Sequence, residues 1–71
     1  MAGKHLVTWL VERQNGRGNP EFAAELGIHR TNWYRLREGI RAANLTDLGR
    51  AIDRYPEHCS SICAVWHKPD A

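Results

Sequence analysis

Residues 19–38 read NPEFAAELGIHRTNWYRLRE, and they decide the fold of this 71-residue chain. We expect a short helix on either side of Gly27, because glycine tolerates the left-handed backbone that ends a helix. Asn19 can cap the first of them, and Pro20 suits its first position because proline lacks an N–H that would be unpaired there. A small residue, Ala23, lets the second helix cross closely over the first. The stretch therefore predicts two short helices joined by a tight turn.

The second helix of this pair is predicted over about Arg30–Glu38, with Gly39 as its stop. Its cap is either His29 or Thr31. The inward positions are Trp33 and Leu36, which fall on one apolar face. Residues 29–31, 34, 35 and 38 are then left outside.

Helical spacing of apolar residues continues on both sides of the pair. One helix is predicted over about Lys4–Gln14. Another runs from Leu45 to Tyr55 with Asn44 as its cap and Asp47 in its first turn. The expected core positions of these two helices are Leu6, Val7, Leu10, Val11, Gln14, Leu45, Leu48, Ala51, Ile52 and Tyr55.

The end of the chain allows two interpretations. Residues 56–66 either form a fifth helix, with Cys59, Ile62, Cys63 and Trp66 on one face, or contain a short strand over residues 62–66. The helix is favoured, and residues 68–71 are expected to fray. The predicted fold is all-α with four or five helices, a helix-turn-helix unit over residues 1–55 and a C-terminal segment over residues 56–71.

Positive charge is concentrated in one short stretch, although the net charge is only +2. Residues 29–41 carry four arginines against a single acid, Glu38, which suits a surface that meets phosphate. The alternative is an ordinary solvated surface, with Arg30 and Arg35 hydrated or paired with Glu38.

The spacing of Phe22-Ala23, Gly27-Ile28, Trp33, Leu36 and Gly39 resembles the helix-turn-helix DNA-binding domains of phage repressors and Cro proteins, the lambda-repressor-like or Xre-like family. The likeness covers residues 19–38 closely and extends loosely from Leu6 to Tyr55. Three positions depart from the family pattern. His29 stands where the cap of the second helix is usually serine or threonine. Trp33 stands where a smaller aliphatic residue is usual and Leu36 where an aromatic residue is frequent, an exchange that roughly preserves core volume.

The resemblance implies a role for each matching position. Arg30, Thr31 and Arg35 would face base edges in the major groove, where an arginine fork can donate two hydrogen bonds to guanine. Arg37 is a weaker candidate for a backbone contact. The backbone or flanking positions would be Arg17, Asn19, His29, Asn32, Tyr34, Glu38 and Arg41.

The implied function is sequence-specific binding of double-stranded DNA by a cytoplasmic transcriptional repressor, with a homodimer contact in residues 56–66 if that segment does not simply cover the core. The alternatives are a protein-interaction module, such as an antitoxin or assembly subunit, and binding to RNA or to DNA without sequence preference.

We expect no enzyme, no cofactor and no small-molecule substrate. Cys59, Cys63 and His67 lack the second ligand pair of a usual zinc site, so no metal is expected, and the thiols should be reduced. No secretory or membrane segment is expected.

Overall fold

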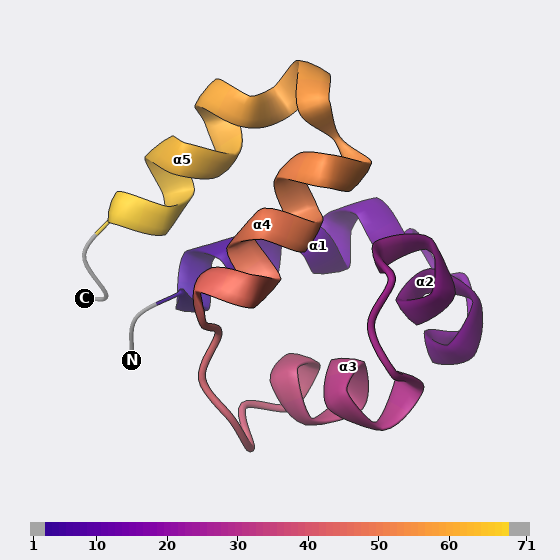
Figure 1. The fold of residues 1–71 in the computed structure, drawn as a ribbon. Coiled ribbons are helices and arrows are strands. Elements are labelled where there is room, and N and C mark those ends of the chain that lie inside the picture. Colours follow the sequence, from indigo (N-terminus) through magenta and orange to yellow (C-terminus); the bar gives the residue numbers. More distant parts are fainter. Residues whose placement is uncertain (1–2, 69–71) are drawn as a thin grey trace.

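The structure is a computed structural model that describes residues 3–68. Within this range the chain is all-helical and contains no strand. The elements are α1 (Lys4–Gln14), α2 (Asn19–Leu26), α3 (Arg30–Arg37), α4 (Leu45–Arg54), the short 3₁₀ helix η1 (Pro56–His58) and α5 (Cys59–His67). In Figure 1, α4 crosses in front of α1, α5 lies on one side of α4, and the α2–α3 pair lies on the other. The described part of the chain has no helix long and apolar enough to cross a membrane.

One core joins all five α-helices. The ring centroids of Phe22 and Trp33 lie 5.0 Å apart, which connects α2 to α3. Ala51 of α4 and Ile62 of α5 are also fully buried. The largest fully buried side chains are Trp33, Phe22, Leu6, Leu10, Leu36 and Ile62.

The predicted boundaries of α1 to α4 are confirmed to within about two residues, and local chemistry explains them. Gly27 has a φ of 73°, and the N–H groups of Gly27 and Ile28 donate to the last carbonyls of α2. At α4 the capping box is complete: the Asn44 side chain accepts from the N–H of Asp47, and the Asp47 carboxylate accepts from the N–H of Asn44.

The cap predicted for α2 is wrong. The N-cap is Gly18, whose extended backbone leads into the helix without a side-chain hydrogen bond, and Asn19 is already the first helical residue. The Asn19 side chain bonds elsewhere, to Gln14 and Arg37.

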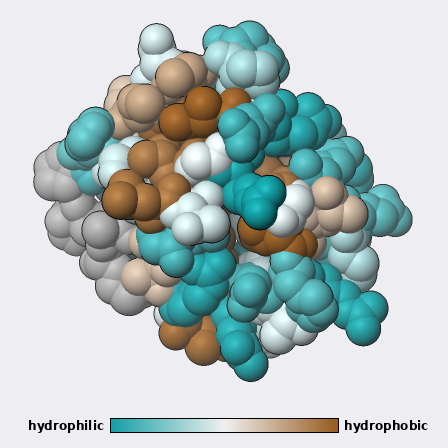
Figure 2. Space-filling view, in the orientation of Figure 1, coloured by the Kyte–Doolittle hydropathy of each residue, from teal (hydrophilic) through white to brown (hydrophobic). Residues whose placement is uncertain are grey.

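Leu45 was expected in the core, and this prediction is also wrong, because its side chain is 73% exposed. The buried line along α4 consists of Asp47, Ala51 and Tyr55, spaced by four residues. Leu45 lies on the neighbouring stripe with Leu48 and Ile52, which are only half-buried. Figure 2 shows apolar surface gathered over α4 and α5, whereas the surface over α3 is mostly hydrophilic.

The helical interpretation of residues 56–66 is confirmed, although its first turn is the 3₁₀ helix η1. α5 packs on α1 and α4. Of the four residues predicted to share its inner face, Ile62 is fully buried, Cys63 and Trp66 are half-buried, and Cys59 is exposed. The prediction that Cys59 lies on the inner face is therefore wrong: Cys59 is the first residue of α5, and its side chain is exposed. Because Ile62 belongs to the core, α5 covers the core. This is one of the two roles considered for residues 56–66, the other being a dimer contact. Of the residues expected to fray, 69–71 lie outside the described residues.

Candidate nucleic-acid interface

α3 is anchored by two side chains on its inner face. Trp33 is fully buried and Leu36 nearly so, which fixes both the position and the rotation of the helix. The side chains predicted as base-reading or flanking on this helix are all exposed: Arg30, Thr31, Asn32, Tyr34, Arg35 and Glu38. A rigid element therefore presents them together.

The start of α3 is formed by His29, which settles the choice left open between His29 and Thr31. The backbone N–H of Thr31 donates to Nδ1 of His29 over 3.1 Å. A neutral imidazole that accepts at Nδ1 carries its proton on Nε2. The exposed ring therefore keeps one donor for an acceptor outside the chain.

Arg30 and Arg35 have no acidic partner within residues 3–68, and neither pairs with Glu38. The alternative in which Glu38 neutralises them is therefore not realised in this part of the chain. As far as residues 3–68 are concerned, these two exposed guanidinium groups keep their charge and their donors for an anion or a base edge.

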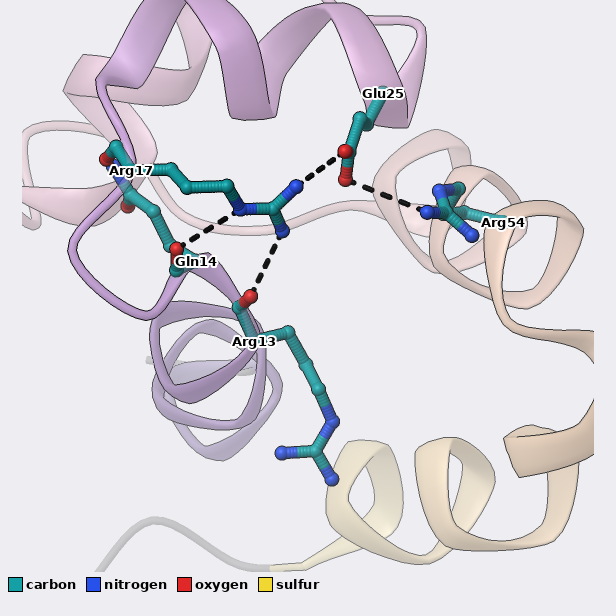
Figure 3. Close-up of polar contacts among 5 residues, drawn as sticks. All are labelled: Arg13, Gln14, Arg17, Glu25 and Arg54. Carbon is teal, nitrogen blue, oxygen red and sulfur yellow. Dashed lines mark hydrogen bonds and ion pairs between the residues drawn. The ribbon is translucent and has the colours of Figure 1, made fainter.

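Arg17 lies in an internal network (Figure 3). Its Nη1 pairs with Glu25, its Nε donates to the Gln14 carbonyl at 3.2 Å, and its Nη2 donates to the Arg13 carbonyl at 3.0 Å. The hydrogen bond that Arg17 donates to the Glu25 carboxylate raises the pKa of Arg17 above its ordinary value, against the opposing effect of desolvation. Glu25 also lies 3.5 Å from Arg54, so this carboxylate joins α2 to α4 and to the loop after α1. The guanidinium of Arg17 therefore makes its contacts within the fold and is compensated there by a carboxylate.

The guanidinium of Arg41 is also compensated within the fold by a carboxylate. Its Nη1 and Nη2 donate to the two carboxylate oxygens of Asp47 at 2.8 and 3.0 Å, and Nη1 also donates to the Ala42 carbonyl. The side-chain hydrogen bond with Asp47 raises the pKa of Arg41, again against desolvation. Because Asp47 is buried, this fork balances a carboxylate that would otherwise have no positively charged partner within residues 3–68.

Asn19 joins the start of α2 to the end of α3. Its Oδ1 accepts from Nε2 of Gln14 at 2.9 Å and from Nη1 of Arg37 at 3.0 Å. Both Asn19 and Arg37 thus lie beside the exposed face of α3, although the sequence marked Arg37 as the weaker candidate.

A cleft of about 450 Å³ separates the α2–α3 turn from the start of α4. His29 and Asn32 line one wall, and Thr46 and Arg50 line the other. Sequence reasoning missed Arg50, which lies outside the basic stretch but reaches over the turn: a Cβ atom added to Gly27 would lie 3.1 Å from its Nη1. Arg50 has no acidic partner within residues 3–68, so it adds a further uncompensated charge near α3.

The two cysteines lie away from this surface, on α5, and both thiols are free. Desolvation, and then a hydrogen bond with Cys59, raises the pKa of the Cys63 thiol. Within the described residues, no group of three or more histidine, cysteine or acidic side chains is placed to hold a metal ion.

Comparison of the chain with models of known protein families gave no match, and comparisons with curated proteins and with solved structures gave none either.

Proposed function

We propose that the chain binds double-stranded DNA with sequence preference through α3, as a helix-turn-helix regulator of the phage repressor and Cro type. The observation that carries the proposal is the pair Arg30 and Arg35: both are exposed on a helix whose opposite face is buried, and neither has an acidic partner within residues 3–68. An eight-residue helix is about 12 Å long, and the major groove, about 12 Å wide, admits a helix.

In this proposal Arg30, Thr31 and Arg35 read base edges. Each arginine can donate two parallel hydrogen bonds to O6 and N7 of guanine, and Thr31 can contact a thymine methyl group. His29, Asn32 and Tyr34 lie beside this face and meet sugar or phosphate. Glu38 lies at the far end of the same face, where a carboxylate can accept from the amino group of cytosine. Occupancy of an operator would then block access to a promoter.

Two copies on a two-fold symmetric site would bury more DNA surface than one copy, so we also propose a homodimer. Because Ile62 belongs to the core, the dimer contact cannot rely on that side chain.

A protein-interaction module, such as an antitoxin or assembly subunit, is the second candidate. It is favoured by Ile40, which is 64% exposed in the segment that connects α3 to α4, and by Leu45, which is 73% exposed at the first position of α4.

Selection from a random duplex library at fixed salt tests the proposal. The wild-type chain should enrich one sequence, with a palindrome if two copies bind. The double variant Arg30→Ala/Arg35→Ala should lose the enrichment and stay folded, because substitution of exposed, unpaired side chains usually changes stability by less than about 0.5 kcal/mol.

Lys68→Ala is the control, since Lys68 is exposed and directly follows α5, the helix that lies on the other side of α4 from the α2–α3 pair (Figure 1). The proposal is wrong if the wild-type chain enriches no sequence, as an interaction module would, or if the double variant enriches the same sequence as the wild type.

A further inference from the structure

We propose that Arg37, positioned by Asn19, binds a phosphodiester group of the DNA backbone beside α3. This inference rests on the proposed function and names a subsite within it. The resemblance implied that Arg17 and Arg41 contact the DNA backbone; we assign such a contact to Arg37 instead.

The first argument is how Arg37 is held. Its Nη1 donates to Oδ1 of Asn19 at 3.0 Å, and Gln14 donates to the same oxygen at 2.9 Å. Gln14 is itself buried and also donates to the Arg17 carbonyl, so the Asn19 amide is oriented from inside the fold. With two donors on Oδ1, the Asn19 Nδ2 group keeps its own donors for an outside acceptor, because no acceptor for it lies within residues 3–68.

The second argument is charge. The carboxylates of Glu25 and Asp47 compensate Arg17 and Arg41. The tether of Arg37 is instead a neutral amide, and no carboxylate pairs with it in the described residues. Arg37 is therefore held in place by one of its five N–H donors and keeps its full positive charge, which is the arrangement that a phosphate oxygen requires.

The third argument is position on α3. Arg37 lies seven residues after Arg30, almost two helical turns, so the two share one flank of the helix. Thr31, Arg35 and Glu38 form the front, opposite Trp33 and Leu36. When a recognition helix enters a groove, its front and its N-terminal end, which carries Arg30, meet base edges, whereas the flank nearer its C-terminal end, which carries Arg37, meets the sugar–phosphate wall. Lys4 of α1 lines the same groove of about 390 Å³ as Arg37 and brings a second positive charge to it, beside the carboxylate of Glu38.

The test uses the full chain and two duplexes, the enriched site and a random sequence, titrated over a range of salt concentrations. Arg37→Gln should weaken binding to both duplexes by about tenfold and to a similar extent, with the base preference unchanged. It should also reduce the slope of log K against log[salt] by about 1, since one phosphate contact is lost.

Asn19→Asp is the second variant. It keeps both hydrogen bonds to the side-chain oxygen and favours the start of α2, yet its carboxylate neutralises Arg37. It should reduce the salt slope by a similar amount without removing the arginine. Lys68→Gln, which removes a distant charge, should leave the slope unchanged.

The inference is overturned if Arg37→Gln keeps the wild-type salt slope and affinity, or if it changes base preference instead. Failure of the proposed function is recognised separately, by a wild-type chain that binds all duplexes equally. Even then the salt slope tests Arg37 on the random duplex, and a chain that binds no duplex overturns both proposals.

Discussion

The backbone N–H of Thr31 donates to Nδ1 of His29 over 3.1 Å, so an imidazole caps α3 in place of the usual serine, threonine, asparagine or aspartate. This bond satisfies one of the unpaired amides in the first turn of the helix that we assign to the major groove. It also holds the His29 ring beside Arg30, at the end of α3 that is nearest to the turn.

His29→Ala should lower the free energy of unfolding by about 1 kcal/mol, because the Thr31 amide loses its acceptor. For a domain of this size, that corresponds to a fall in Tm of roughly 4–8 °C. His29→Ser, which restores a capping side chain, should have a free energy of unfolding close to that of the wild type. Urea denaturation of the three proteins measures the difference, and equal stability of His29→Ala and the wild type would show that the cap contributes nothing.

Arg41 and Arg35 should respond in opposite ways to substitution. Arg41→Ala should cost about 2 kcal/mol of stability, because it leaves the buried Asp47 carboxylate without its partner. Arg35→Ala should change stability by less than about 0.5 kcal/mol but relax the preference for one base step, as a base-reading arginine predicts. Urea denaturation measures the stability of both variants, and duplex selection measures their base preference. An Arg41→Ala protein of wild-type stability that binds DNA poorly would contradict the structural role given to Arg41.

Gly27 and Gly39 should each resist replacement by alanine. Their φ angles are 73° and 76°, and a left-handed backbone costs other residues about 1–2 kcal/mol. At Gly39 a Cβ atom would meet open space, whereas at Gly27 it would crowd Arg50, whose flexible end can move. We therefore expect similar losses of stability at the two sites once Arg50→Ala is introduced as background. A neutral Gly27→Ala would contradict the turn geometry.

The helices were predictable from the sequence because their ends depend on neighbouring residues. Asn44 and Asp47 are three residues apart and cap α4 as the pattern indicated. Gly27 ends α2 by its own backbone conformation. Leu45 could not be placed in this way, because helical spacing indicates which residues share a stripe but not which of two adjacent stripes faces the core.

The state of each arginine could not be predicted, because it depends on tertiary contacts. Arg17 meets Glu25 eight residues further on, and Arg37 meets Asn19 across two helices. Neither spacing belongs to the three- and four-residue pairs that a helix pattern reveals. The sequence could indicate a basic stretch, but not that Arg17 and Arg41 are neutralised while Arg30 and Arg35 have no acidic partner within residues 3–68.

The central claim is that the exposed face of α3 is the surface that meets the duplex. Its most direct test is the backbone amide NMR spectrum of the chain during titration with the enriched duplex at fixed salt. We predict shifts concentrated at residues 29–38 and at Asn19, with little change along α5. Shifts centred on Leu45 or α5, with the α3 amides unmoved, would contradict the account.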